Sequence, residues 1–301
     1  MKRLLTILAL PLCLAFVSCN EDEYNADTAE SYYQPYLGAR RVASLKTTFV
    51  ENGNESVHEH NFQYDAKGRI KSINSNSVIY TSFVMNNNGF KDTVDCRGYM
   101  TSAANYFYRG EGLEVAYNVS IEYPDYPSMN GYYSTSVYGV FKQNGVLDRF
   151  SQVSFDYSST MLQRAYVDGG SYVDVTRDSD GNVTGYRKCE MSGEVHEDKS
   201  DAYLYFPIAN RTNFDFSAYF GYWGVEQSIP DIRISYRAPY QLAAFGMIGS
   251  TSKYLPWGVK EREPGGEFNE IKGEWELDEN NIYPLSFVDP YGRKTVITYC
   301  E

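Results

Sequence analysis

The fold class of this chain is decided by the stretch Phe62-Gln-Tyr-Asp-Ala-Lys-Gly-Arg-Ile-Lys-Ser-Ile73. Apolar and polar residues alternate on both sides of a central Asp65-Ala-Lys-Gly68, and a period of two is the pattern of a β-strand with one buried face. Glycine in the last position of this group relieves the strain of the positive φ angle that a tight turn imposes. The stretch therefore predicts a β-hairpin with a turn at Gly68, and with Tyr64 and Ile70 as core anchors on either side of it.

The same arrangement recurs along most of the chain. Short alternating runs rich in Val, Ile, Tyr, Phe and Thr are separated by turns such as Asn86-Asn-Asn-Gly89, Asp178-Ser-Asp-Gly181 and Asp289-Pro-Tyr-Gly292. A single hairpin cannot bury its own apolar face, so repeated hairpins have to stack side by side. The sequence therefore predicts a mainly β fold, an antiparallel meander in a curled or partly closed sheet.

One region departs from this pattern. Between Pro239 and Gly249, the apolar residues Leu242, Phe245 and Ile248 are three positions apart. Proline near the start and glycine at the end are typical of a short helix. The segment from residue 213 to 220 predicts a further turn of helix. We therefore expect residues 39–301 to form a single β domain with a short helical insert.

The chain begins with a leader. Two basic residues precede the apolar run from Leu4 to Val17, which is followed by Ser18 and Cys19. This run is shorter than the roughly 20 residues that span a bilayer, and it fits a signal peptide at residues 1–18. The junction resembles the lipobox of bacterial lipoproteins, which implies that Cys19 carries lipid. The alternative is an ordinary signal peptide that is cut near Ser18, leaving Cys19 for a disulfide.

Residues 19–38 are expected to form an acidic flexible tether. Between Asn20 and Glu30 there are five acidic residues and no basic ones, and such a polar, self-repelling segment stays extended. An acidic stretch directly after a lipidated cysteine resembles the surface-export signal of Bacteroidota lipoproteins. The resemblance implies an outer-membrane protein that is anchored by lipid and faces the cell exterior. A plain solvated linker is the alternative.

The hairpins also resemble known repeats. The segment Tyr64-Asp-Ala-Lys-Gly-Arg-Ile70 resembles the YD repeat of Rhs-type proteins, and residues 153–165 and 178–184 are degenerate copies. Together with the helical insert, Ser252-Lys-Tyr-Leu-Pro256 and a closing hairpin, residues 40–301 resemble an uncharacterised domain of Bacteroidota outer-membrane lipoproteins that has a porin-like β fold. That family has no assigned activity, so the resemblance implies a fold and a location.

Charge and motifs exclude several classes of function. The chain has 27 basic and 39 acidic residues, with a net charge of −12, which argues against nucleic acid as a partner because phosphate binding needs basic surface. The sequence contains no glycine-rich phosphate loop, no Gly-x-Ser-x-Gly and no His-Glu-x-x-His. We therefore assign no catalytic residue and no cofactor. Of the cysteines after Cys19, namely Cys96, Cys189 and Cys300, at most two can pair within one molecule.

Two short motifs contain residue types that bind metal ions. His58 and His60 lie two positions apart, which on a strand places both on one face, but ordinary strand polarity explains them better. Asp178-Ser-Asp-Gly-Asn182 has its glycine fourth rather than sixth, so it fits a β-turn better than a calcium loop. No metal site is predicted.

Tyrosine is the outlier in composition, with 29 residues beside 16 Phe and 3 Trp. Tyrosine favours strands and the boundary between core and water, and it also stacks on sugar rings and makes rigid protein contacts. The densest aromatic patch, residues 219–224, belongs to the region outside the hairpin pattern, where a ligand site is most readily built. The candidate ligand-binding residues are Tyr219, Tyr222, Trp223 and Trp257.

The sequence thus leaves three functions in order of preference. The first is a lipid-anchored surface lipoprotein that binds glycan or protein and is not an enzyme. The second is a periplasm-facing carrier that holds an apolar ligand in a curved β-sheet, and the third is a glycan-processing enzyme. A cavity lined by Leu, Ile and Phe favours the carrier, whereas an exposed Tyr/Trp platform favours glycan binding.

Overall fold

The computed structural model describes residues 31–33, 39–51, 53–87, 90–167, 169–222, 224, 238–262 and 266–301. The signal peptide, Cys19, Trp223, and residues 88 and 89 of the expected turn at Asn86 lie outside the described residues. Within the described part of the chain, no helix is both long enough and apolar enough to cross a membrane.

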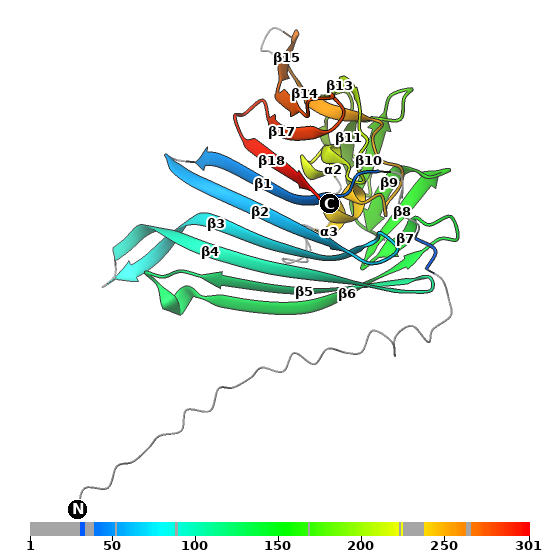
Figure 1. Cartoon of the computed structure of the whole chain (residues 1–301). Helices are drawn as coiled ribbons and strands as arrows, with labels where there is room; N and C mark the ends of the chain where they lie inside the picture. Colours follow the sequence, from blue (N-terminus) through cyan, green and yellow to red (C-terminus); the bar gives the residue numbers. More distant parts are fainter. Residues whose placement is uncertain are drawn as a thin grey trace, which may run out of the picture.

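Fifteen strands form one antiparallel sheet, which confirms the predicted meander (Figure 1). Their order across the sheet runs from β12 back to β1 and then continues through β18, β17 and β16. The strands of this sheet are β1 (Val42–Glu51), β2 (Asn54–Tyr64), β3 (Ile70–Asn87), β4 (Phe90–Arg109), β5 (Gly112–Glu122), β6 (Gly131–Phe141), β7 (Leu147–Phe150), β8 (Val153–Ser158), β9 (Met161–Val167), β10 (Tyr172–Arg177), β11 (Val183–Cys189), β12 (Val195–Asp198), β16 (Glu274–Leu277), β17 (Pro284–Val288) and β18 (Lys294–Tyr299).

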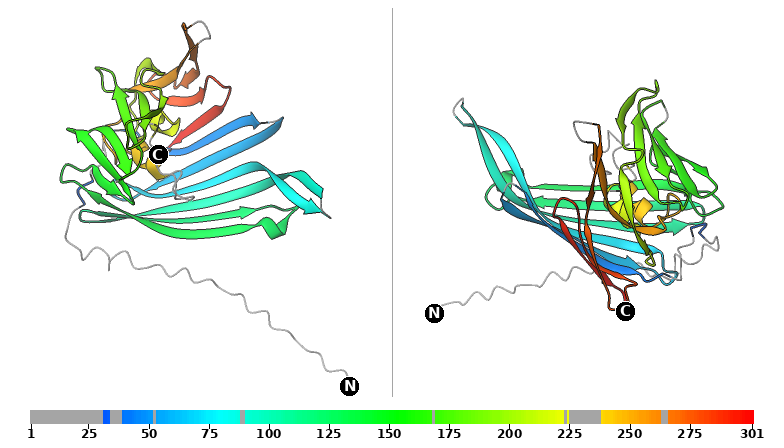
Figure 2. Two further views of the ribbon diagram at one scale, coloured as in Figure 1. Left: turned by 180° about the vertical axis from the view of Figure 1, so that it is seen from behind. Right: turned by 90° about the horizontal axis from the view of Figure 1, so that it is seen from above.

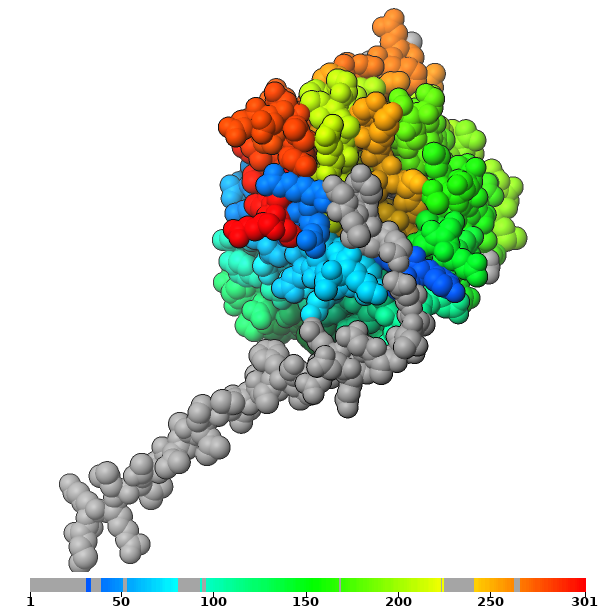
Figure 3. Space-filling view, turned by 45° about the vertical axis from the view of Figure 1, so that its right-hand side comes forward, coloured from blue at the N-terminus to red at the C-terminus, as the bar shows by residue number. Residues whose placement is uncertain are grey.

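The first and last strands of the chain meet inside this sheet. Strand β1 pairs with β18, with Leu45 opposite Ile297 and Thr47 opposite Thr295. Figure 3 shows the same junction on the surface, where red C-terminal residues lie against blue N-terminal ones. The sheet edges are therefore the short strands β12 and β16. The described parts of the chain that connect these two strands lie outside the large sheet.

The remaining elements of the described residues are a small sheet and three short helices. They are β13 (Tyr203–Ala209), β14 (Tyr254–Arg262), β15 (Phe268–Lys272), α2 (Phe216–Tyr219), α3 (Ala238–Ala244) and the 3-10 helix η1 (Pro127–Met129). The small sheet contacts strands near both edges of the large one. From β13, the Tyr205 hydroxyl donates to the carbonyl of Val183 in β11 at 2.8 Å, and Pro256 of β14 accepts a bond from Trp275 of β16 at 2.6 Å.

The curled sheet wraps around α2 and α3, which lie in its interior (Figure 2). Phe216 of α2 and Leu242 of α3 are fully buried. The predicted helical insert is therefore confirmed, but α3 ends at Ala244 rather than at Gly249. It ends there because Gly246 adopts a φ of 72°, with its amide bonded to the Ala243 carbonyl and the next amide bonded to Leu242, which is a Schellman motif.

Three hairpin turns of the sheet share one hydrogen-bond pattern. In each, the aspartate amide donates to the carbonyl four residues on, and the aspartate Oδ1 accepts the amides two and four residues on. Each has glycine with a positive φ in the fourth position, and φ at Gly68 is 79°. Ile70 is buried and Tyr64 packs against the core, so the predicted turn and its two anchors are confirmed. The three turns begin at Asp65, Asp178 and Asp289.

Folded contacts begin within the range that we expected to be a tether. Ser31 and Tyr33 are buried, and the Tyr33 hydroxyl donates to the carbonyl of Phe245 at 2.6 Å. Its ring also stacks on Tyr108 and Phe141. Burial raises the pKa of the Tyr33 hydroxyl, because the phenolate is poorly solvated there. Ser31 and Tyr33 thus pack into the β domain, whereas Tyr32 between them is exposed.

Candidate functional site

A pocket of about 290 Å³ lies where β1, β2, β18 and α2 meet the turn between β17 and β18. Its lining combines aromatic rings, hydroxyl groups and charged side chains. The lining residues are Thr47, Phe49, His58, His60, Tyr219, Phe220, Asp289, Arg293 and Thr295.

The strand register explains why β1 and β2 contribute to this pocket. Alternate residues of β1 face inward, and Leu45 is buried in the core. Thr47 and Phe49 follow on the same face and lie beyond the core, in the pocket. Across the pair, His60 lies opposite Leu45 and His58 lies opposite Thr47. The inner face therefore passes from the buried core at Leu45 into the pocket at Thr47 and Phe49.

Cross-strand contacts orient the two histidines. The Nδ1 atom of His58 lies 2.7 Å from the Ser77 hydroxyl, and Nδ1 of His60 lies 2.7 Å from the Ser75 hydroxyl. Both pairs are direct neighbours in the register of β2 and β3. The His60 ring also meets the Tyr219 ring edge-on, with centroids 5.8 Å apart. As predicted from their spacing, the two histidines occupy one face of a strand.

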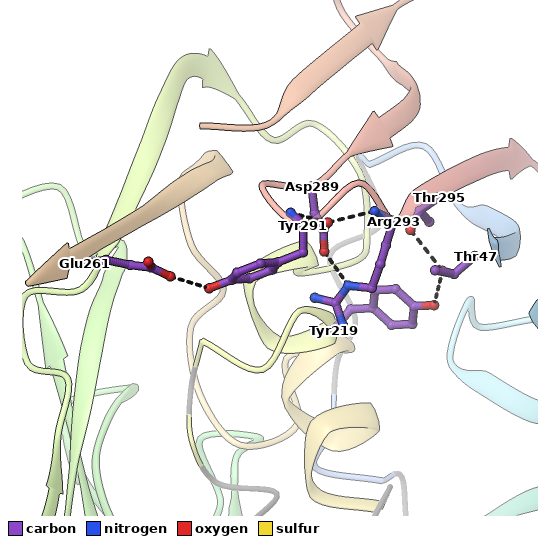
Figure 4. A network of polar contacts seen from close by, with 7 residues as sticks. All are labelled: Thr47, Tyr219, Glu261, Asp289, Tyr291, Arg293 and Thr295. Carbon is purple, nitrogen blue, oxygen red and sulfur yellow. Dashed lines mark hydrogen bonds and ion pairs between the residues drawn. The ribbon is translucent and has the colours of Figure 1, made fainter. Parts of the chain in front are cut away.

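A chain of hydroxyl groups crosses from the helix to the sheet (Figure 4). The Tyr219 hydroxyl lies 2.8 Å from Thr47 Oγ1, which in turn lies 2.9 Å from Thr295 Oγ1. Asp215 caps the N-terminus of α2 by accepting the Ser217 amide, which fixes the helix that carries Tyr219. The tyrosine ring is thereby held between the helix and two strands.

The turn from Asp289 to Arg293 forms the charged side of the pocket. Asp289 accepts the amides of Tyr291 and Arg293 with Oδ1, and it accepts Arg293 Nε with Oδ2 (Figure 4). The Tyr291 hydroxyl donates to Glu261 of β14 at 2.9 Å. Partial burial, together with this carboxylate, raises the pKa of Tyr291. The turn is thus fixed by its own aspartate and tied to the small sheet.

The residues predicted to bind a ligand lie in different environments. Tyr219 lines the pocket. Tyr222 is buried and stacks on Tyr203 at 3.9 Å, and burial raises the pKa of its hydroxyl. Trp257 lies in β14, edge-on to Phe206 and under the ammonium of Lys272. Trp223 lies outside the described residues, so Tyr219 is the predicted residue that the structure places in this pocket.

Sequence reasoning did not bring the other lining residues together. The inward positions of Thr47 and Phe49 follow from the alternation of β1, and this signal was available. The meeting of β1 with the turn at Asp289 depends on pairing between the two ends of the chain. No local pattern encodes that pairing.

A second polar group is a structural network rather than a site. Asp215 is fully buried and accepts the amides of Ser217 at 2.8 Å and Ser252 at 2.6 Å. The hydroxyls of Ser217 and Ser252 lie 2.9 Å apart, and Tyr205 adds a further contact to Ser252. Asp215, Ser217 and Ser252 are all buried. Their network therefore holds together α2, β13 and the loop that precedes β14.

The described residues contain no group of three His, Cys, Asp or Glu side chains that could hold a metal ion. The three cysteines of the domain are free, with Cys96 and Cys189 buried and Cys300 partly buried. The turn at Asp178 is a β-turn, as its glycine spacing predicts. Both carboxylate oxygens of Asp178 accept hydrogen bonds from residues of the same turn.

Comparison with known proteins gives a distant likeness in structure. No protein-family model matches the chain, and no curated protein matches it. The chain is similar to the crystal structure of a porin-like protein from Bacteroides uniformis, with 12% sequence identity and a TM-score of 0.44. The alignment covers 87% of this chain and 99% of that one.

Proposed function

We propose that this chain is a lipid-anchored surface lipoprotein whose β domain binds a glycan without catalysis. The observation that carries this proposal is the lining of the pocket between β1, β2, β18 and α2. The rings of Phe49, Tyr219 and Phe220 lie there beside hydroxyl and charged side chains. A sugar ring has apolar C–H faces and a rim of hydroxyl groups, so it needs both kinds of partner.

The rigidity of the site supports binding. Thr47 and Phe49 belong to a strand that is paired on both sides, and Tyr219 is held by Thr47 and by its capped helix. A site that is already formed loses little conformational entropy when a ligand enters it. This supports a binding module on the β domain.

The carrier of an apolar ligand has less support. Such a carrier needs an apolar cavity inside the curl of the sheet, and fully buried side chains such as Phe216, Leu242 and Ile248 fill that interior. The enzyme also has less support, because the contacts of His58 and His60 to serine follow the strand register and are typical of cross-strand pairs.

The location rests on the leader. Lipid on Cys19 anchors the protein in the outer membrane, and the acidic residues after it direct the domain to the cell exterior. Protease added to intact cells tests this orientation. Resistance of the domain in intact cells, with digestion after lysis, contradicts surface exposure.

Binding to a glycan array, followed by calorimetry with the mature lipoprotein in detergent, tests the function. We expect Phe49→Ala to weaken binding severalfold, because it removes an aromatic ring from the pocket. The matched control is Phe268→Ala, since Phe268 is an exposed aromatic residue of β15 outside the pocket. The function is wrong if no glycan binds, or if Phe49→Ala binds as tightly as the wild type.

A further inference from the structure

The three turns that begin with aspartate differ at their fifth residue. What varies is how many donors of that side chain bond to the aspartate. In the turn at Asp178, the side-chain Nδ2 of Asn182 donates a single bond to Asp178 Oδ2, at 2.9 Å. One side-chain donor is therefore enough to complete this type of turn. An arginine in the same position brings several more donors than the turn needs.

The two arginines in this position are used differently. Arg69 donates both Nε and Nη2 to Asp65, its side chain is 15% exposed, and its guanidinium lies 4.4 Å from the centroid of the Tyr108 ring. Arg293 contacts Asp289 through Nε, its side chain is 47% exposed, and it lines the pocket. Its guanidinium lies 5.8 Å from the centroid of the Tyr291 ring, and within the described part of the chain its two terminal nitrogens have no hydrogen-bond or ion-pair partner.

We propose that the pocket selects an acidic sugar and that Arg293 binds the sugar's carboxylate with its two terminal nitrogens. This rests on the glycan-binding function proposed above and names its ligand class. A guanidinium matches a carboxylate with two parallel hydrogen bonds, and it does so best when its orientation is fixed. The bond from Nε to Asp289 fixes that orientation.

The other charges of the pocket are compatible with such a ligand. Asp289 is the acidic residue of the lining, and its oxygens accept two amides and Nε, so its negative charge is compensated within the turn. The hydroxyls of Thr47, Tyr219 and Thr295 form a hydrogen-bonded chain in the lining, a polar surface that suits the hydroxyl groups of a sugar. The net charge of −12 repels an anion at long range, so contacts inside the pocket have to provide the selection.

Paired ligands test this proposal. Three oligosaccharides, ending in glucuronate, galacturonate and sialate, are each titrated as the free acid and as the methyl ester against the mature lipoprotein in detergent. The ester keeps the shape of the sugar and removes the charge. We expect at least one acid to bind about tenfold more tightly than its ester, the scale of one hydrogen bond to a charged group.

Substitutions at the two arginines locate the effect. Arg293→Gln and Arg293→Lys should both remove the preference for the acid, since neither variant retains the two-nitrogen fork. Arg69→Gln is the matched control, because it makes the same change in the same type of turn outside the pocket, and it should keep the preference. Urea midpoints of all three variants verify that they are folded.

The outcomes separate the two proposals. If a neutral glycan binds in a manner that depends on Phe49, and no acid exceeds its ester, the pocket binds glycans but the acidic class is wrong. A preference that survives in folded Arg293→Gln also overturns the role of Arg293. If no glycan of either kind binds, the glycan-binding function fails, and the acidic class fails with it.

Discussion

The indole N–H of Trp275 donates to the carbonyl oxygen of Pro256 at 2.6 Å, across the gap between two sheets. Trp275 lies in β16, an edge of the fifteen-stranded sheet, and Pro256 lies in β14 of the small sheet. The neighbouring amide of Gly273 donates to the Trp257 carbonyl at 2.7 Å. These bonds satisfy polar groups at the edge of the sheet, where β16 has no further described strand beside it. They also hold the small sheet against the large curled sheet.

We expect Trp275→Phe to destabilise the domain by about 1 to 3 kcal/mol, because it leaves the buried Pro256 carbonyl without this donor. A phenylalanine ring can still stack on Phe287, as the indole does at 4.4 Å. Trp257→Phe is the control, because no hydrogen bond of its indole contributes to this junction. Urea denaturation measures both, and equal losses in the two variants contradict the assigned role of the bond.

Gly292→Ala should destabilise the domain by about 1 kcal/mol through backbone strain alone. Gly292 has a φ of 80°, and a Cβ atom there meets nothing within 4 Å. Gly131→Ala is the matched control, because its Cβ also meets nothing within 4 Å and its φ is not positive. Thermal unfolding compares the two variants, and the turn geometry is wrong if both leave the midpoint unchanged.

Leu242→Ala should cost about 2 to 5 kcal/mol, the usual range for truncating a buried leucine. Leu242 is fully buried in α3, at the centre of the curled sheet. Met191→Ala, at a side chain that is 72% exposed, should change stability by less than about 0.5 kcal/mol. Chemical denaturation with both variants checks whether the helical insert is part of the core. A small loss for Leu242→Ala implies that the helix is dispensable to it.

Asp278 should contribute stability that depends on pH. Its Oδ1 accepts the amides of Ile282 and Tyr283 in the turn between β16 and β17, and these bonds lower the pKa of the carboxyl. A carboxyl with a lowered pKa stabilises the fold above the ordinary aspartate value of about 3.9, and this stabilisation is lost as the pH falls toward the lowered value.

Asp278→Asn, which keeps an acceptor oxygen but not the charge, tests this linkage. The difference in urea midpoint between the wild type and this variant should be larger at pH 7 than at pH 3. A difference that is equal at both pH values shows that the charge of Asp278 contributes nothing to the turn.

Cys19→Ala should abolish metabolic labelling with palmitate and partitioning into detergent, if the leader directs lipid to Cys19 as we propose. Cys300→Ala is the control, since Cys300 is a free thiol of the folded domain and its loss should leave labelling intact. Labelling that persists in Cys19→Ala rules out this anchor.

Much of the fold followed from local patterns. Alternation around Asp65 and Gly68 predicted strands on both sides of a tight turn, and the structure has them. The spacing of apolar residues predicts a helix that ends at Gly249. The structure ends α3 earlier, because the glycine that stops the helix is Gly246. Two glycines close together both satisfy the sequence rule, and packing of Phe245 and the following residues into the core decides between them.

The candidate site was less predictable, since its lining comes from three distant segments of the chain, namely β1 with β2, α2, and the turn at Asp289 with β18. Tyr219 was singled out for its aromatic neighbours, and it does line the pocket. Tyr222 belongs to the same aromatic stretch and is buried against Tyr203 instead. Composition identifies where aromatic residues gather, but the direction in which each side chain points depends on the packing of α2 against the sheet.

The strands around the turn at Asp65 and the positive φ of Gly68 follow from local sequence, because φ preferences and period-two alternation are properties of a few adjacent residues. The burial of Arg69 against Tyr108 and the exposure of Arg293 to a pocket depend instead on contacts between distant segments. Both occupy the same position of the same turn. Their difference arises from what packs around each turn, since Tyr108 of β4 covers Arg69, whereas the pairing of β1 with β18 places the turn of Arg293 beside a pocket.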